Sequence, residues 1–222
     1  MRPPFTPDAI VFDLDGLLVD TEPRWEAAER RLIADLGGTW DPAVRQQLLG
    51  VGPETSARIL AQHLGVADEG MVARRLLVAA LEEFRRGVRA LAGAQELLTA
   101  LQGRVPTAVA TNSRRVLADT AMAGAGLDGL VDALVCVEDV DEPKPAPDPY
   151  RRACAELGGE PTRSLAFEDS PPGIAAAVAA GLWTVAVPSV PGASVDGAHA
   201  LLESLEAVDV AALVPSAGRP DG

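Results

Sequence analysis

The order of apolar and polar positions predicts buried strands that alternate with helices. Residues 9–14 form a short apolar run with a proline before it and a glycine after it, which is typical of a buried strand. Similar runs follow later in the chain, at 105–110, 131–137, 164–167 and 183–187. Apolar residues at helical spacing separate them, at about 93–102, 114–124, 149–157 and 172–180. Strands that are apolar throughout and alternate with helices predict a parallel sheet covered on both faces.

Residues 22–86 have a different pattern, with no strand-like run. This region is rich in Ala, Leu, Arg and Glu, its apolar residues have helical spacing, and glycines interrupt it at 37–38, 50–53 and 65. We therefore predict an α/β fold with a Rossmann-like parallel-sheet core and an all-helical cap domain inserted after the first strand. The predicted core is discontinuous, comprising residues 1–20 and 88–222, and the predicted cap comprises residues 21–87.

Polar side chains gather where the predicted strands end. In open parallel sheets, ligands bind beyond the carboxyl ends of the strands. The residues at or just after these ends are Asp13, Asp15, Thr111, Asn112, Lys144, Glu168 and Asp169. Each has an ordinary explanation by itself, as a turn former, a helix N-cap or a solvated loop residue. Four strand ends with chemically matched side chains favour one active site over four separate coincidences.

The residue types at these strand ends indicate phosphoryl chemistry. Clustered carboxylates without a nearby His or Cys are hard oxygen ligands, which suit Mg²⁺. An ionised carboxylate such as Asp13 can attack phosphorus and form an aspartyl-phosphate. Asp15, two residues on, can then act as general acid and base. Thr111 and Lys144 can bind the phosphoryl oxygens and offset their charge.

The amino-acid composition limits the classes of partner that this protein can bind. Of the 222 residues, 48% are hydrophobic and 23% are charged, as in soluble globular proteins. The 19 basic and 32 acidic residues give a net charge of −13, so we expect neither nucleic acid nor an anionic membrane as a partner. An anionic substrate then requires a local cation, either a metal ion or a lysine.

The apolar segments and the two cysteines indicate the cellular compartment that we expect for this protein. The first residues lack the long apolar segment of a signal peptide, and the apolar stretch 174–187 is too short to cross a bilayer. Cys136 and Cys154 lie within apolar or helical patterns, which predicts two reduced, buried thiols. We expect a cytoplasmic protein, monomeric or a small homo-oligomer, that acts on a small phosphorylated metabolite.

Four motifs carry a family resemblance. In chain order they are DLDGLLVDTE, TNS, KPAPDPY and EDSPPGI. Together with their spacing, they resemble the haloacid dehalogenase superfamily phosphohydrolases. The subgroup that they resemble is the β-phosphoglucomutase-like and sugar-phosphate phosphatase group, which has a helical cap inserted after the first strand. The resemblance extends to about residue 210.

The resemblance implies a catalytic pair and a Mg²⁺ site. Asp13 resembles the family nucleophile, and Asp15 resembles the general acid/base, whose main-chain carbonyl also binds the metal. Asp169 resembles the direct metal ligand. Glu168, beside it, is expected to act on the metal through water.

The resemblance also implies the substrate contacts. Thr111 matches the phosphate-binding hydroxyl of the second motif, and Lys144 matches the lysine of the third motif. Asn112, the neighbour of Thr111, is expected to help bind the phosphate. Glu22 and Trp25, at the start of the cap, are candidate specificity residues. We predict that Glu22 contacts substrate hydroxyls and that Trp25 offers a flat apolar face to a sugar ring, with packing as the alternative for Trp25.

Rival activities within the superfamily depend on particular residues. A dehalogenase lacks the second aspartate, which is present here as Asp15, and a phosphonatase uses a cap lysine, whereas no lysine lies between Asp13 and Lys144. A β-phosphoglucomutase has a cap histidine and a cap arginine in the regions of Trp25 and Pro53. We therefore predict Mg²⁺-dependent hydrolysis of small phosphomonoesters, of sugars or polyols, through an aspartyl-phosphate. A phosphosugar mutase and a non-catalytic binding protein of the same fold remain the alternatives.

Overall fold

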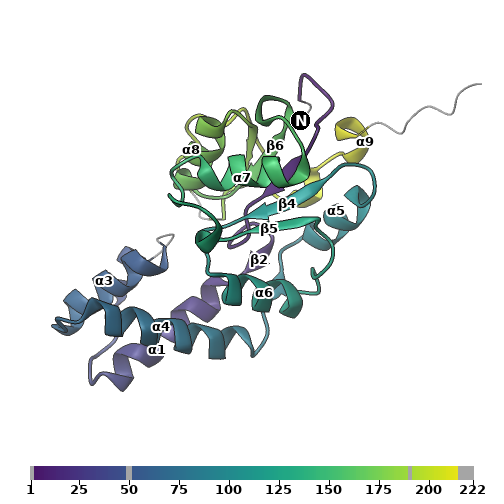
Figure 1. The fold of residues 1–222 in the computed structure, drawn as a ribbon. Helices are drawn as coiled ribbons and strands as arrows, with labels where there is room; N and C mark the ends of the chain where they lie inside the picture. The colour runs from purple at the N-terminus through teal and green to yellow at the C-terminus, as the bar shows by residue number, and fades with distance from the viewer. Residues whose placement is uncertain (1–2, 49–51, 190–191, 215–222) are drawn as a thin grey trace, which may run out of the picture.

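A six-stranded parallel sheet forms the centre of the larger lobe (Figure 1). The computed structural model describes residues 3–48, 52–189 and 192–214. In spatial order the strands are β5 (Ala133–Val135), β4 (Thr107–Ala110), β1 (Ile10–Phe12), β6 (Leu165–Glu168), β7 (Trp183–Ala186) and β8 (Ala200–Leu201). Phe12, the last residue of β1, pairs with Val109 on one side and Phe167 on the other. The carboxyl ends of β1, β4 and β6 therefore meet at one edge of the sheet.

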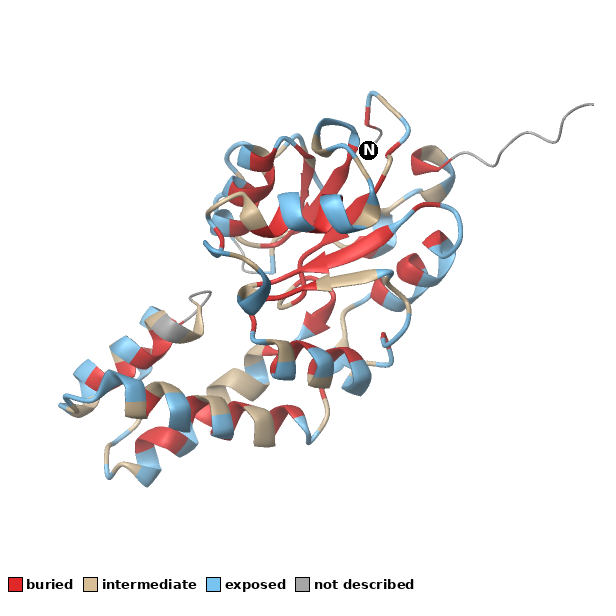
Figure 2. Cartoon of the chain, in the orientation of Figure 1, coloured by how far each residue is buried: buried red, intermediate tan, exposed pale blue. Residues whose placement is uncertain are grey.

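Helices cover both faces of this sheet, as the apolar strands predicted. They are α5 (Ala94–Leu101), α6 (Arg115–Gly124), α7 (Asp148–Leu157), α8 (Pro171–Ala180) and the short α9 (Val210–Leu213). Because strand side chains alternate between faces, Ile10 and Phe12 join a core cluster that includes residues of α5 and α6. Val11 joins a second cluster formed with α7 and α8. Figure 2 shows the resulting burial of the strands.

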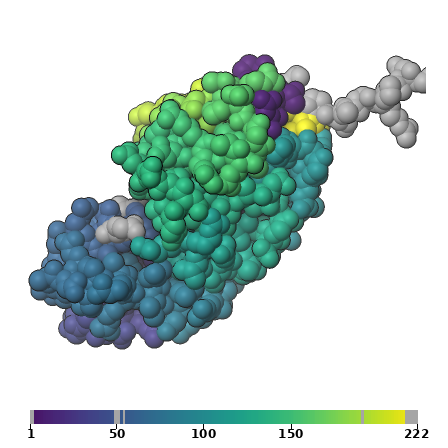
Figure 3. Space-filling model, in the orientation of Figure 1, coloured from purple at the N-terminus to yellow at the C-terminus, as the bar shows by residue number. Residues whose placement is uncertain are grey.

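A helical lobe follows the first strand. It contains α1 (Glu22–Asp35), α2 (Pro42–Leu48), α3 (Pro53–Leu64) and α4 (Glu69–Phe84), and α4 packs against both α1 and α3. The chain enters it through β2 (Val19–Asp20) and returns through β3 (Arg89–Ala90), which pair antiparallel. Figures 1 and 3 show this lobe beside the larger one. The α/β core with its helical cap is thus confirmed, and the domain bounds of 21–87 stay a prediction.

Local chemistry explains where the cap helices end. Gly37 has a φ of +76° and Gly65 a φ of +64°, a left-handed conformation that glycine adopts most readily. Pro53 occupies the first turn of α3, where its missing N–H costs nothing. The predicted break at 50–53 falls partly on residues 50 and 51, which lie outside the described residues.

The structure also contains elements that the pattern did not predict. These are β2, β3, β8, α9 and three 3-10 turns, η1 (Val137–Asp139), η2 (Pro161–Arg163) and η3 (Leu205–Ala207). Strands of two residues and helices of one turn are too short to show a periodicity. Four of the five predicted strands are also shorter than expected; β1, for example, covers 10–12 within the predicted 9–14. The strand β6 keeps its expected length but covers 165–168 rather than 164–167.

The cysteines and the lengths of the helices can also be compared with the sequence predictions. Cys136 and Cys154 are free and buried, as predicted. Within 3–48, 52–189 and 192–214, every helix falls short of the length and apolarity that crossing a bilayer requires.

Candidate active site

Three neighbouring strand ends bring the predicted site residues together. Asp13 follows β1 directly, Thr111 follows β4, and Glu168 and Asp169 lie at the end of β6. The backbone N–H of Asp13 donates to the carbonyl of Phe167 at 3.0 Å, which ties the end of β1 to β6. Lys144 reaches the same place from the segment between η1 and α7. The convergence expected from the strand ends is therefore present.

Lys144 joins two of these acids. Its Nζ atom lies 2.5 Å from Oδ1 of Asp13 and 2.5 Å from Oε1 of Glu168, and all three side chains are buried. The hydroxyl of Tyr150, on α7, donates to the same Glu168 oxygen at 2.7 Å. Lys144 is also the only lysine among the 222 residues. A buried lysine with two carboxylate partners is held in one position, facing Asp13.

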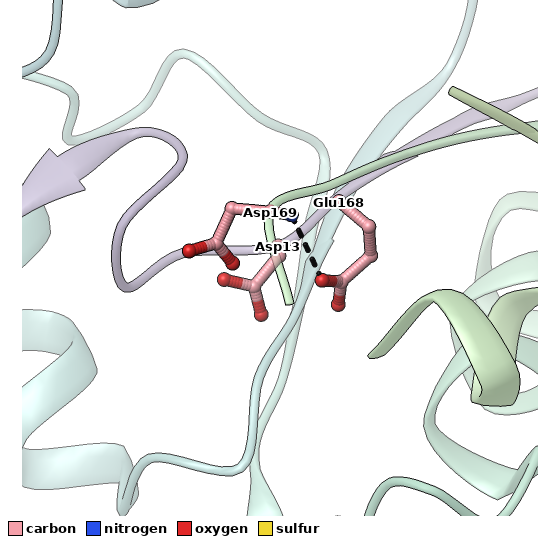
Figure 4. A group of neighbouring side chains, drawn as sticks. All are labelled: Asp13, Glu168 and Asp169. Carbon is pink, nitrogen blue, oxygen red and sulfur yellow. Dashed lines mark hydrogen bonds between the residues drawn. The ribbon is translucent and has the colours of Figure 1, made fainter. Parts of the chain in front are cut away.

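An acidic cluster lies beside the lysine. Asp13, Glu168 and Asp169 each offer a carboxylate oxygen, and these oxygens lie within 4.8 Å of one another (Figure 4). The Oδ1 atom of Asp169 is buried and has no hydrogen-bond partner. A buried acceptor without a partner is costly unless a ligand satisfies it. Hard carboxylate oxygens with one unsatisfied member fit a divalent cation such as Mg²⁺.

Two glycines make room for this cluster. A Cβ atom on Gly16 would lie 2.3 Å from Oδ2 of Asp169, and one on Gly173 would lie 1.8 Å from Oε1 of Glu168. Gly16 also has a φ of +89°, a conformation that other residues rarely adopt. Glu168 is further fixed by the backbone N–H groups of Asp169 and Ser170, which donate to its Oε2 at 3.0 and 3.1 Å. The acids are therefore held close together by the backbone around them.

Burial dominates the electrostatics of the cluster. Loss of hydration raises the pKa of Asp13 well above its ordinary value, although Lys144 opposes the shift. Burial and the nearby Glu168 raise the pKa of Asp169 to about 7. Burial alone would lower the pKa of Lys144, but Asp13 and Glu168 outweigh it and raise that pKa. The lysine is therefore charged, and a cation among the acids would favour their ionised forms.

Asp15 lies outside this cluster, among hydroxyl groups. Thr21 donates to its Oδ1 at 2.8 Å, and Ser113 and Thr111 donate to its Oδ2 at 2.7 and 3.2 Å. Thr21 precedes α1, but its side chain makes no cap hydrogen bond because the hydroxyl is directed to Asp15. Asp13 and Asp15 thus have different surroundings, as separate roles would require.

Asn112 is bonded to the backbone around the lysine. Its side-chain amide donates to the carbonyl of Lys144 at 3.1 Å, and its oxygen accepts from the Lys144 backbone N–H at 2.9 Å. This pair of bonds holds the loop that carries the lysine. The direct phosphate contact predicted for Asn112 stays a prediction.

A cavity of about 570 Å³ opens between the two lobes onto these residues. The core side contributes Asp13, Asp15, Thr111, Lys144 and Asp169, among others. The cap side contributes Glu22, Trp25, Glu29, Arg45 and Thr55, among others. Both predicted specificity residues therefore line the cavity, and Trp25 also packs edge-on against Phe84, with ring centres 5.5 Å apart.

Sequence reasoning missed several residues of this site. Ser113, Thr21 and Tyr150 lie within three of the motifs, but none of them matches a residue to which the resemblance assigns a role. Glu29 and Arg45 belong to helical patterns in which a charged residue normally faces solvent. None of these five residues carries a sequence pattern that marks it as part of the site.

Known proteins resemble this chain over most of its length. A fructose-1-phosphate phosphatase of Escherichia coli K12 is 32% identical over 179 residues, covering 80% of this chain and 95% of that protein. Hexitol phosphatase B of the same organism is 30% identical over 195 residues, covering 82% and 83%. The crystal structure of CbbY from Rhodobacter sphaeroides in complex with phosphate has a TM-score of 0.82 at 27% identity, covering 93% and 99%.

A family model that matches most of the chain shows which family this protein belongs to. The model of haloacid dehalogenase-like hydrolases matches residues 7–181, which include every predicted site residue. The family resemblance seen in the four motifs is confirmed, and this chain belongs to the haloacid dehalogenase-like hydrolases.

Proposed function

We propose that this protein is a Mg²⁺-dependent phosphatase of small phosphomonoesters, with sugar or polyol phosphates as its substrates. The observation that carries the proposal is the position of Asp13. Its carboxylate is at the edge of the cavity, 2.5 Å from a charged lysine and within the cluster that contains the unsatisfied Asp169 oxygen. The two E. coli relatives are named as phosphatases of a sugar phosphate and of hexitol phosphates.

In the proposed first step, a carboxylate oxygen of Asp13 attacks the phosphorus of the substrate. The bond from phosphorus to the ester oxygen breaks, and the Asp15 carboxyl gives its proton to the departing alkoxide. Lys144 stays beside the phosphoryl group and offsets its charge, and the hydroxyl of Thr111 is available to its oxygens. The products are a free alcohol and an aspartyl-phosphate on Asp13.

In the proposed second step, Asp15 takes a proton from a water molecule, which attacks the phosphorus of the aspartyl-phosphate. The bond from phosphorus to the Asp13 oxygen breaks, and inorganic phosphate leaves with both aspartates restored. Thr21 and Ser113, which donate to Asp15 at 2.8 and 2.7 Å, hold its carboxyl in place for both proton transfers.

The cation proposed for the acidic cluster would be held by Asp13, Asp169 and the main-chain carbonyl of Asp15, with Glu168 near it. A bound Mg²⁺ supplies positive charge to the phosphoryl oxygens as negative charge spreads over them. The fit rests on the hard oxygen ligands, the unsatisfied Asp169 oxygen and the space left by Gly16 and Gly173.

The mutase alternative requires a place for a second phosphate. Trp25 and Pro53 line the cavity at the positions predicted for the mutase histidine and arginine, and neither side chain can shuttle a proton or bind phosphate. Simple hydrolysis is therefore the better proposal. Conversion of β-glucose 1-phosphate to glucose 6-phosphate, with a bisphosphate activator, would favour the mutase instead.

Phosphate release from p-nitrophenyl phosphate and a panel of sugar and polyol phosphates tests the proposal. We expect turnover with Mg²⁺ and its loss when EDTA removes the metal. A protein that binds these esters and releases no phosphate would be a non-catalytic member of the family, and the proposal would be wrong.

A further inference from the structure

The cap wall of the cavity contains a buried carboxyl oxygen that accepts no hydrogen bond within the described structure. Glu29, in the middle of α1, is 2% exposed, and its buried Oε2 atom has no hydrogen-bond partner. The nearest cation is Nη1 of Arg45, at 4.0 Å, which is too far for a hydrogen bond. Burying such a group destabilises the fold, so its place in the cavity wall indicates a ligand that satisfies it.

Arg45 is surrounded by acids. Its Nη2 atom lies 2.5 Å from Glu22, and its Nε atom lies 3.4 Å from Glu26. Together with Glu29, three carboxyl groups of α1 face one guanidinium group of α2. The positive charge of Arg45 is therefore already balanced, and this part of the wall is neutral or negative.

The protonation of Glu29 suits a neutral partner. Burial raises the pKa of Glu29 to about 8, against the opposing effect of Arg45 and with help from Glu22 and Glu26. Near neutral pH the Glu29 carboxyl therefore carries a proton and can both donate and accept a hydrogen bond. A hydroxyl group on a substrate has the same two capacities.

A second anionic group on the substrate would be repelled by the carboxyl groups around Arg45. To bind Arg45, it would have to displace Glu22 and approach two further carboxyl groups. Such repulsion discriminates between substrates as effectively as a new attractive contact. A second phosphate or a carboxylate is thus disfavoured at this wall.

We infer that Glu29, Arg45 and Glu22 bind the alcohol part of the substrate and select neutral polyhydroxylated alcohols over alcohols that bear a second phosphate or a carboxylate. This inference rests on the proposed phosphatase function and deepens it. The phosphoryl group is held by the core, and the hydroxyl-rich remainder lies against α1 and α2.

The test compares kcat/KM for a hexitol phosphate, a hexose bisphosphate, phosphoglycolate and p-nitrophenyl phosphate. In the wild-type protein, we expect kcat/KM for the hexitol phosphate to exceed that for phosphoglycolate and for the bisphosphate by at least about tenfold. In Glu29→Leu, whose side chain can neither donate nor accept a hydrogen bond, we expect the loss for the hexitol phosphate to be at least about tenfold greater than the loss for p-nitrophenyl phosphate.

A second variant tests the charge argument without touching the buried carboxyl. Glu22→Gln removes the closest partner of Arg45, so kcat/KM for phosphoglycolate should rise relative to the hexitol phosphate. Glu83→Gln is the matched control, because Glu83 is a buried glutamate of α4 that pairs with Arg86 at 2.9 Å and is not among the residues that line the cavity. Glu83→Gln should leave kcat/KM for the hexitol phosphate unchanged relative to both p-nitrophenyl phosphate and phosphoglycolate.

The outcomes separate the two proposals. Absence of turnover on every ester, p-nitrophenyl phosphate included, would overturn the phosphatase itself. Turnover of p-nitrophenyl phosphate with a preference for phosphoglycolate or the bisphosphate would overturn only the inference about the cap wall. Equal losses for all substrates in Glu29→Leu would also overturn it, since they would indicate a purely structural role.

Discussion

Lys144 and Asp13 form a buried ion pair, with Nζ of the lysine 2.5 Å from Oδ1 of the aspartate. The same Nζ atom is 2.5 Å from Glu168, so one cation balances two acids. Both partners of the pair come from segments that the sheet brings together across a separation of 131 residues. The pair thus links the stability of the core to the chemistry proposed for its edge.

Removing the lysine should destabilise the protein. We expect Lys144→Met to lower the free energy of unfolding by about 3 kcal/mol in EDTA, because it leaves two buried carboxylates without their cation. Urea denaturation measures this change. Arg152→Met is the control, since the Arg152 pair with Glu156 is exposed and should contribute less than about 1 kcal/mol. Equal stabilities for Lys144→Met and the wild type would contradict the buried pair.

The burial of the only lysine should also be visible chemically. Reductive methylation of the native protein should modify the terminal amine and leave the peptide that contains Lys144 unmodified. In concentrated urea, the same peptide should react. Mass spectrometry of the digested protein distinguishes the two cases, and ready modification of native Lys144 would show that the amine is accessible.

Gly173 should not tolerate a methyl group. Alanine normally stabilises a helix relative to glycine by about 1 kcal/mol, yet here its Cβ would lie 1.8 Å from Glu168. We expect Gly173→Ala to destabilise the protein by about 2 kcal/mol and to weaken Mg²⁺ binding, measured by thermal unfolding with and without the metal. Gly124→Ala is the control, because its nearest neighbour would be 3.4 Å away. Matching behaviour of the two variants would count against the tight cradle.

Glu29 should make stability depend on pH. Its pKa rises from an ordinary 4.5 to about 8 in the folded protein, so the folded state holds the proton more tightly than the unfolded state. The contribution of Glu29 to stability is therefore greatest below about pH 4.5 and falls as the pH rises toward 8. The slope from this one group is at most about 1.4 kcal/mol per pH unit.

Glu29→Gln isolates that contribution from those of the other buried acids. The difference in unfolding free energy between this variant and the wild type should shift in favour of the variant from pH 5 to pH 8, by urea denaturation. A constant difference across this pH range would mean that Glu29 titrates normally.

Much of this fold can be predicted from the sequence because its hydrophobic periodicity and its helix-ending glycines are clear. The apolar strands alternate with amphipathic helices, and the glycines at 37 and 65 end cap helices where they were expected to. The convergence of Asp13, Lys144 and Asp169 followed from the rule that strand ends meet at one edge of the sheet. These inferences needed only local pattern and topology.

The remaining features depend on contacts between distant segments. Nothing near Asp15 indicates that hydroxyls from residues 21, 111 and 113 would surround it. Glu29 and Arg45 each look like surface residues of a helix, and only the packing of the cap helices buries Glu29 and partly covers Arg45. The substrate side of the site was therefore the part that the sequence could least predict.

The most direct test of the proposed chemistry is to acid-quench the protein during turnover of a hexitol phosphate with Mg²⁺ and to analyse its peptides by mass spectrometry. The mechanism predicts one phosphoryl group on the peptide that contains Asp13, and its absence from Asp13→Asn, whose kcat should fall at least about 10³-fold. Undiminished turnover in Asp13→Asn, or a phosphoryl group on another residue, would contradict it.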